Sequence, residues 1–153
     1  MARLSDLPGG MTEHLLKLPL PEFDDTALVA GPPLAERRVA IVTSAGLMRR
    51  GEDAFAPGDA DYRVIPGDVR GADLLMSHIS VNYDRAGFVE DTNVVFPIDR
   101  LRELAEDGTI GSVADHHYSF MGATDPEKMA LPAAEVSGHL QADRVDAVLL
   151  TPV

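Results

Sequence analysis

Three histidines lie near the ends of predicted strands or in the loops beside them, and they are His78, His116 and His117. An imidazole has a pKa close to neutrality, so it can deliver or remove a proton under physiological conditions. A tyrosine or serine next to it can orient a ligand. His117 is followed by Tyr118 and Ser119, which makes this segment the strongest local candidate for acid–base chemistry.

A metal site is a second chemistry that histidines could support, here with Asp84, Asp99 or Asp115 as carboxylate ligands. The spacing of these residues matches no established metal motif. His116 and His117 are adjacent, and neighbours on an extended segment point to opposite sides. We therefore predict no bound metal, while a catalytic or substrate-binding histidine and purely structural histidines both stay open.

Polar residues elsewhere could complete a pocket around these histidines. Asn82 and Asp84 follow an apolar segment and could bind a polar substrate, although such residues are also ordinary turn formers. The predicted pocket lies near Thr43. The catalytic residues predicted in it are His117 and His78, and the substrate-binding residues are Ser44, Asn82, Asp84, Tyr118, Ser119 and Thr151.

The turn at residues 44–46 has the sequence Ser-Ala-Gly and follows a predicted strand. Its backbone N–H groups could face an anion, but the turn lacks the GxGxxG pattern of a phosphate-binding loop, so an ordinary strand-to-loop turn is favoured. No serine in the sequence lies in a G-x-S-x-G elbow, which disfavours a serine hydrolase.

Several short apolar segments predict strands that would position these side chains. The clearest are residues 38–43 and 145–153, which are continuous and rich in β-branched or aliphatic residues. A run at 72–80 is ambiguous between strand and buried helix, and we favour strand. The other expected extended segments are 61–66, 113–122 and 91–96, the last being either a short strand or an extended lead-in.

Two helices are expected between these strands. The first begins at or just before Asp99 and ends at Gly108. The second follows Asp125 and Pro126, a favourable N-cap and first-turn pair, and runs toward Gln141. Pro132 interrupts this pattern, so the second helix is either kinked there or begins near that residue.

The order of these elements predicts an α/β fold with three layers, in which a mostly parallel sheet of the Rossmann or flavodoxin-like type is flanked by helices. Residues 38–153 form this domain, and residues 1–37 form a proline-rich arm with a short helical turn at 12–17. The arm docks on the domain or contacts a second chain, and the apolar residues expected to dock it are Leu15, Leu16, Leu18, Leu20 and Phe23.

We expect residues 145–153 to be buried on both faces, as strands of parallel sheets are. A buried strand of this kind normally leads into a loop and a covering helix, so the fold is expected to be incomplete at its C-terminus. Chemistry in such sheets lies beyond the carboxyl ends of the strands, which is the edge concerned.

Composition limits the classes of partner. The chain has 153 residues and a formal net charge of −12, which disfavours nucleic acid and anionic membranes and leaves small molecules and proteins. It has no cysteine, no apolar run of about 20 residues and no secretory signal, so we expect a cytoplasmic protein without disulfides or a thiol nucleophile in these residues. No bound cofactor is predicted.

Seven blocks, in the same order, resemble the selenoprotein B family of glycine, sarcosine and betaine reductases, to which D-proline reductase is related. The blocks are RVAIVTSAGL (38–47), RVIPGD (63–68), MSHIS (76–80), VFPIDRLREL (95–104), GTIGS (108–112), HYSFMG (117–122) and VDAVLLTP (145–152).

The resemblance implies a reductive cleavage of a C–N bond in a small amino-acid-like substrate. In this family the segment matching residues 145–151 leads into a selenocysteine or cysteine that attacks the substrate's α-carbon. We therefore expect the native product to continue past Val153 with such a residue and a covering helix, and the 153 residues alone to be inactive. The resemblance also implies a partner reductase subunit bearing a pyruvoyl group.

The alternative is a non-catalytic binding or assembly module that pairs with a second subunit. An uncovered strand at the end of the sheet would favour association, so a homo-oligomer is expected under either interpretation.

Overall fold

The computed structural model describes residues 6–17, 28–80 and 83–153. Its main sheet has five strands, which are β1 (Arg38–Thr43), β3 (Tyr62–Pro66), β5 (Ser112–Val113), β6 (His116–Phe120) and β7 (Ala147–Thr151). Strand β1 lies between β6 and β7, and β3 pairs with the other side of β6. The short strand β5 pairs with β1 on the same side as β6.

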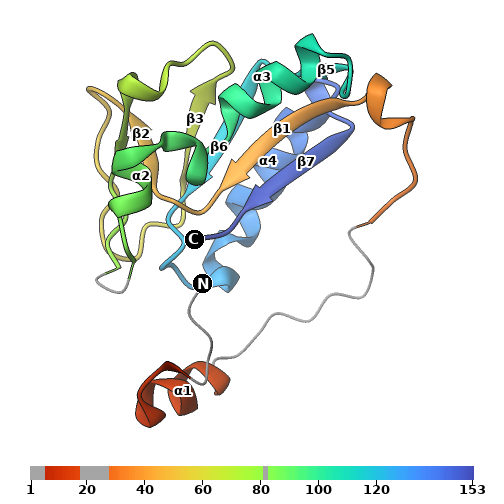
Figure 1. The fold of residues 1–153 in the computed structure, drawn as a ribbon. Helices are drawn as coiled ribbons and strands as arrows, with labels where there is room; N and C mark the ends of the chain where they lie inside the picture. The colour runs from red at the N-terminus through yellow and green to blue at the C-terminus, as the bar shows by residue number, and fades with distance from the viewer. Residues whose placement is uncertain (1–5, 18–27, 81–82) are drawn as a thin grey trace.

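The strands β5, β6 and β7 all run parallel to β1, and β3 pairs antiparallel with β6. Helix α3 (Ile98–Glu106) lies against one face of the sheet and α4 (Ala130–Ala142) against the other (Figure 1). The predicted α/β class, with a mostly parallel sheet between helices, is confirmed.

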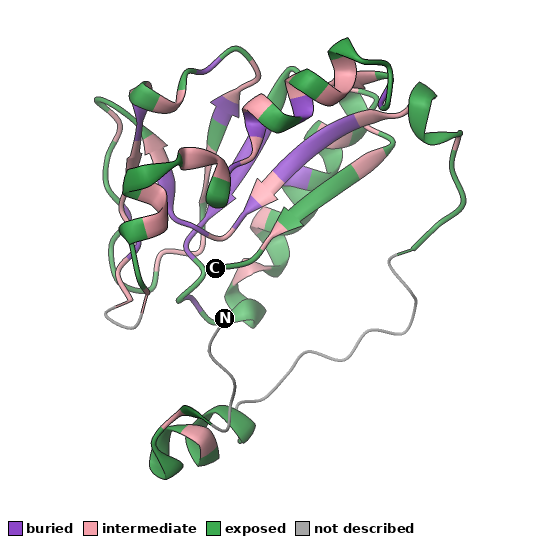
Figure 2. Cartoon of the chain, in the orientation of Figure 1, coloured by how far each residue is buried: buried purple, intermediate pink, exposed green. Residues whose placement is uncertain are grey.

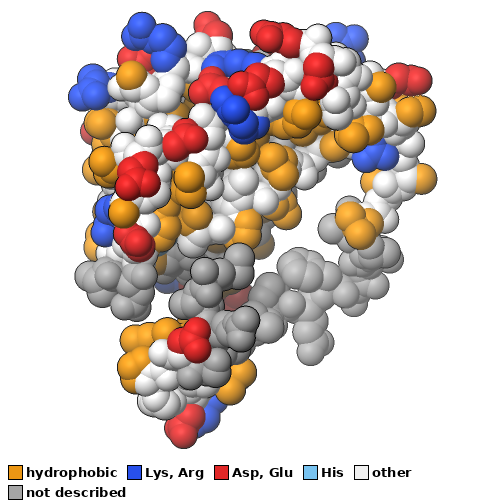
Figure 3. Space-filling view, viewed as in Figure 1, with side chains coloured by type: hydrophobic (Ala, Val, Ile, Leu, Met, Phe, Trp, Pro, Cys, Tyr) orange, Lys and Arg blue, Asp and Glu red, His pale blue; other side chains and the backbone are white. Residues whose placement is uncertain are grey.

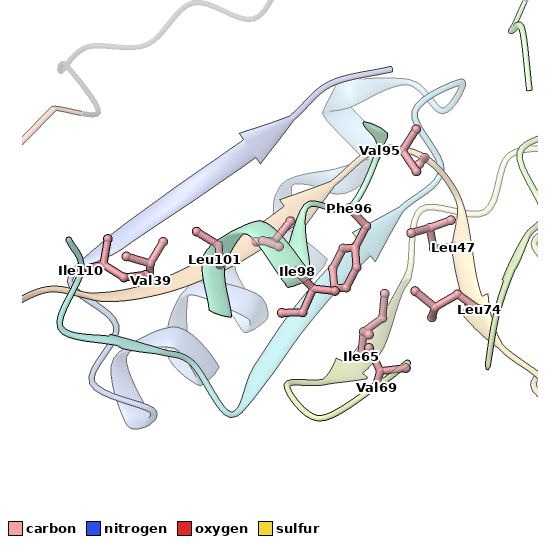
Figure 4. Packing of buried hydrophobic residues seen from close by; sticks show 12 residues of the cluster. Val39, Leu47, Ile65, Val69, Leu74, Val95, Phe96, Ile98, Leu101 and Ile110 are labelled. Atoms are coloured by element: carbon pink, nitrogen blue, oxygen red, sulfur yellow. The ribbon is translucent and has the colours of Figure 1, made fainter. Parts of the chain in front are cut away.

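The core is built on β1, whose residues Val39 and Ile41 are buried on the face toward α3. Ile98 and Leu101 of α3 pack onto this face, and Phe96 lies next to them in the core (Figure 4). The opposite face carries a smaller cluster in which the buried residues Tyr118, Phe120 and Val136 pack beneath α4.

Both expected helices are present. Helix α3 follows Pro97, and Gly108 adopts a φ of +79° just after it, a conformation that glycine adopts without a Cβ penalty. Asp125 caps a 3-10 turn, η5 (Pro126–Met129), by accepting a hydrogen bond from Glu127 N, and α4 begins at Ala130. Pro132 therefore lies in the first turn of α4, where a missing N–H costs no intrahelical bond.

Other expectations about local structure were wrong or incomplete. Residues 91–96 are not a strand, because Asp91 caps a 3-10 turn, η4 (Thr92–Val94). The run at 72–80 contains only a short strand, β4 (Leu74–Met76), after the turn η3 (Gly71–Asp73).

Three short elements were not predicted from the sequence. They are η2 (Leu34–Glu36), β2 (Leu47–Arg49) and α2 (Ala86–Glu90). Strand β2 pairs antiparallel with β4 to form a separate two-stranded sheet.

The expectation that the last strand is buried on both faces is wrong for this structure. Strand β7 pairs with β1 along one side and is one of the two edge strands of the described sheet, the other being β3. Val148, Leu149 and Leu150 are 39%, 38% and 68% exposed. Figure 2 shows β1 largely buried and β7 largely exposed.

The N-terminal arm contains α1 (Gly9–Leu16), where the sequence predicted a helical turn at 12–17. None of its residues is buried, and Leu15 and Leu16 are exposed. The other apolar residues expected to dock the arm, Leu18, Leu20 and Phe23, lie outside the described residues. No helix in the described ranges is long and apolar enough to cross a bilayer.

A bulge separates β5 from β6. Three steps along β1, from Val39 to Val42, correspond to five steps on the partner, from Val113 to Tyr118. The extra residues interrupt the backbone hydrogen bonds between β1 and its partner. At this interruption Ile41 N donates to Nδ1 of the His117 imidazole at 2.9 Å.

Asp143 satisfies the backbone at this bulge. Its Oδ2 accepts from Asp115 N at 2.8 Å, and its Oδ1 accepts from Arg38 Nη2 at 2.6 Å. Arg38 also donates to Val113 O at 2.8 Å. Burial alone would raise the pKa of Asp143, but hydrogen bonds from Arg38 and Asp115 N outweigh it and hold this pKa below its ordinary value.

We predict that Asp143→Ala lowers the free energy of unfolding by about 2 kcal/mol, because it removes one of the two carboxylates that pair with Arg38 and leaves Asp115 N without its acceptor. Asp143→Asn keeps an acceptor and should cost about half as much. Urea unfolding at pH 7 measures both changes. Asp73→Ala breaks the exposed pair with Arg70 and should leave the midpoint unchanged. Equal midpoints for Asp143→Ala and Asp73→Ala would contradict the assignment.

Candidate functional site

A groove of about 300 Å³ lies at the carboxyl ends of β1, β6 and β7, on the face that carries α4. Ligands in parallel α/β sheets bind at this edge. The walls are mostly apolar, and the lining residues are Val42, Thr43, Ser44, Phe120, Gly122, Thr124, Pro126, Met129, Leu150, Thr151 and Pro152.

Ser44 connects the strands that border the groove through both its backbone and its hydroxyl group. Ser44 N donates to Thr151 O at 3.2 Å, and Ser44 Oγ accepts from Val153 N at 2.9 Å. Ser44 O accepts from Gly122 N at 2.9 Å. The loop after β1 is thereby joined to the ends of both neighbouring strands.

Hydroxyl groups form a row across these strands on the opposite face of the sheet. Thr43 is in register with Ser119 of β6 and with Thr151 of β7. Thr43 Oγ1 and Thr151 Oγ1 donate to Val95 O at 2.9 and 3.0 Å, and Ser119 Oγ accepts from Leu47 N at 2.7 Å. This row holds η4 and the start of β2 against the sheet.

His78 lies against the same β1 loop but does not line the groove. A Cβ at Gly46 would come within 3.1 Å of the His78 backbone, and Gly46 O accepts from Ser77 N. The buried His78 ring lies 4.9 Å from the Tyr83 ring, centroid to centroid, and its Nδ1 accepts from Ser80 N. Burial, helped by the positive charge of Arg85, lowers the pKa of His78.

His117 is fully buried within the sheet, on the face toward α3. Its ring meets the Phe96 ring edge-on at 5.5 Å. Burial, together with the charge of Arg102, lowers the pKa of His117 to about 4, so the imidazole is neutral at pH 7. Since Nδ1 accepts from Ile41 N, the proton is on Nε2, which has no hydrogen-bond partner among the described residues.

Tyr118 points to the other face of the sheet, as alternation along β6 requires. Its ring packs edge-on against Tyr62 and stacks on His139, beside α4. A second groove, of about 470 Å³, lies beside Tyr118 and His139 at the bulge. It is at the amino end of β6, so we centre the candidate site on the smaller groove.

The predicted site residues are therefore only partly together. Ser44 and Thr151 line the groove, and Ser119 is in the hydroxyl row. His117 and Tyr118 lie on opposite faces of the sheet. Asp84 lies on the surface and accepts a hydrogen bond from Ala86 N, and Asn82 lies outside the described residues. They do not line one pocket, and their functional roles stay predictions.

The apolar walls of the groove were missed. Phe120, Gly122, Met129 and Leu150 come from three separate segments. The local signal for the groove was Gly122, a glycine shortly after the end of β6. No group of three or more His, Cys, Asp or Glu side chains that could hold a metal occurs in residues 6–17, 28–80 and 83–153.

A protein-family model described as glycine/sarcosine/betaine reductase selenoprotein B matches residues 11–153. The D-proline reductase subunit gamma of Acetoanaerobium sticklandii is 38% identical over 77% of this chain and 49% of its own length. The sarcosine reductase complex component B subunit beta of Peptoclostridium acidaminophilum is 34% identical over 87% of this chain and 32% of its own.

The glycine reductase complex component B subunit gamma of Symbiobacterium thermophilum is 31% identical over 90% of this chain and 34% of its own length. The chain thus spans about half of the first relative and about a third of the others. No solved structure matches. The family model covers nearly the whole chain, and the chain therefore belongs to the glycine/sarcosine/betaine reductase selenoprotein B family.

Proposed function

We propose that this chain forms one wall of the substrate site in a reductase that cleaves a C–N bond of a small amino-acid-like substrate. The observation that carries the proposal is the groove at the carboxyl ends of β1, β6 and β7, in a chain whose relatives are named for D-proline, sarcosine and glycine reduction. An apolar groove suits the carbon skeleton of such a substrate.

The nucleophile comes from outside these residues, because the 153 residues contain no cysteine. In the proposed reaction a selenolate or thiolate bonds to the α-carbon, and the amine leaves with the electron pair of the C–N bond and takes up a proton. A dithiol then supplies two electrons and two protons to release the carbon product. The apolar walls would keep water from the reacting carbon.

The polar residues around the groove have distinct proposed roles. Ser44 hydrogen-bonds the substrate, and Thr151 and Ser119 position the strand ends. The two predicted catalytic histidines do not line the groove, so we propose both as positioning residues. His78 supports the loop that borders the groove, and His117 supports the bulge.

A change of charge at Met129 tests the proposed site. Met129→Glu places a carboxylate in the apolar groove, where it should repel the substrate carboxylate and weaken binding at least tenfold, about 1.4 kcal/mol. Binding of glycine, sarcosine, betaine and D-proline is followed by NMR titration of methyl groups in the 153-residue chain. We expect shifts at Leu150 and Thr151 for at least one of these ligands.

The matched control is Val64→Glu, which puts the same charge in the groove beside His139 and should leave affinity unchanged. The proposed site would be refuted by shifts centred on His139, or by the absence of a shift near Leu150 with all four ligands. Equal affinity in the parent and in Met129→Glu would also refute it.

A further inference from the structure

The outer edge of β7 is an open site for strand pairing. All five residues of β7 are in parallel register with β1, from Val39 with Ala147 to Thr43 with Thr151. Within the part of the chain that the structure describes, no strand pairs with the other side of β7. An edge of this kind presents unpaired backbone N–H and C=O groups.

Charged residues, proline and a bulge, each of which can protect an edge strand, are absent from β7. Its sequence, AVLLT, contains no charged residue and no proline, and its register with β1 is continuous, without a bulge. Figure 3 shows charged side chains gathered over α3 and hydrophobic side chains exposed over the sheet region below it. The edge is built to be paired rather than to face water.

Both faces of the strand are apolar. Leu149 is in register with Ile41, which is buried toward α3, and Val148 and Leu150 are in register with Ala40 and Val42. An edge strand with one solvated face would alternate apolar and polar residues, whereas a strand inside a helix-covered parallel sheet is apolar throughout. The pattern of β7 is therefore that of an interior strand.

We propose that β7 pairs in parallel with a strand from another stretch of polypeptide. That stretch corresponds to the part of the relatives that this chain does not span. That part is about half of the D-proline reductase relative and about two thirds of the others. A second copy of this chain fits less well, because it would bring two bodies of net charge −12 together. The proposal rests on family membership and does not depend on the proposed chemistry.

The backbone geometry identifies the amides that should respond. Ser44 N donates to Thr151 O, and in the register of β7 with β1 the backbone groups of Ala147 and Leu149 point toward β1 as those of Thr151 do. The N–H groups of Val148 and Leu150 therefore point outward. Pairing on the outer edge should slow hydrogen exchange at Val148 and Leu150 at least about 100-fold, with little change at Ala147 and Leu149.

The experiment joins the unmatched part of the Acetoanaerobium sticklandii relative to this chain in one polypeptide and, separately, adds it as a second one. Exchange is measured by NMR, with the 153-residue chain alone as reference. Val148→Pro removes an outward N–H but no bond to β1, and should abolish the protection of Leu150. Val148→Ala keeps the N–H and should retain this protection.

Three results would overturn the proposal. One is free exchange at Val148 and Leu150 in both formats, and another is an added part that stays unfolded by circular dichroism. The third is protection that already occurs in the chain alone and rises with its concentration, which would show that a second copy occupies the edge. Each readout is independent of ligand binding in the groove, so failure here is distinct from failure of the proposed function.

Discussion

Acidification from pH 7 to pH 4 is expected to lower the free energy of unfolding by about 3 kcal/mol through His117 alone. The pKa of His117 is lowered from its ordinary value of 6.5 to about 4 in the folded chain. Below pH 6.5 the unfolded chain therefore binds a proton that the folded chain refuses. The stabilising contribution is complete above pH 6.5, declines as the pH falls, and stops declining below about pH 4.

His117→Asn is the matched variant, because Oδ1 of its amide is attached to Cγ as Nδ1 is and can still accept from Ile41 N, while the side chain carries no titrating group. Urea unfolding at pH 7, 5.5 and 4.5 should show a smaller acid loss in the variant than in the parent. His78 contributes in the same direction in both proteins, since its pKa is also lowered. Identical slopes in parent and variant would refute the buried neutral imidazole.

Asp143 acts in a different pH window. Its pKa lies below its ordinary value of 3.8, so its stabilising contribution is present above that value and is lost as the pH falls toward the lowered pKa. The two effects are therefore separable within one series of unfolding curves.

The fold could be predicted where sequence pattern and burial agree. The run at 38–43 is apolar and β-branched, and it is the central strand β1. The same pattern occurs in β7, but this strand is at an exposed edge of the sheet. An apolar composition is typical of an interior strand, but it does not determine whether a neighbouring strand is present to pair with it. The 3-10 turn η4 was missed because the Asp91 cap overrides the β propensity of the following valines.

The site was predicted only in part for a related reason. Ser44 and Thr151 were found because both follow or end parallel strands, whose carboxyl ends meet at one edge. The expectation for His117 and Tyr118 took adjacency in sequence as proximity in space. Alternation along β6 sends the two side chains to opposite faces, where one lies by Phe96 and the other under α4.

Replacing Gly122 is expected to remove the groove's binding capacity. A Cβ at Gly122 would lie 2.8 Å from Ser44 O and 2.9 Å from Ser44 Cβ. Neither atom is the end of a flexible side chain, so Gly122→Ala must push the loop after β1 away from the end of β6. This overpacking should cost about 1–3 kcal/mol of unfolding free energy. It should also break the bond from Gly122 N to Ser44 O, which shapes one side of the groove.

The comparison with Gly138→Ala isolates the cause. Gly138 is an exposed residue of α4, and a Cβ added there would have no other atom within 4 Å, so alanine should raise stability by about 0.5–1 kcal/mol. Both variants are measured by urea unfolding and by the NMR titration used for Met129→Glu. Ligand shifts at Leu150 should vanish in Gly122→Ala and persist in Gly138→Ala. If Gly122→Ala kept parental stability and shifts, the close approach of Ser44 to Gly122 would have no part in forming the site.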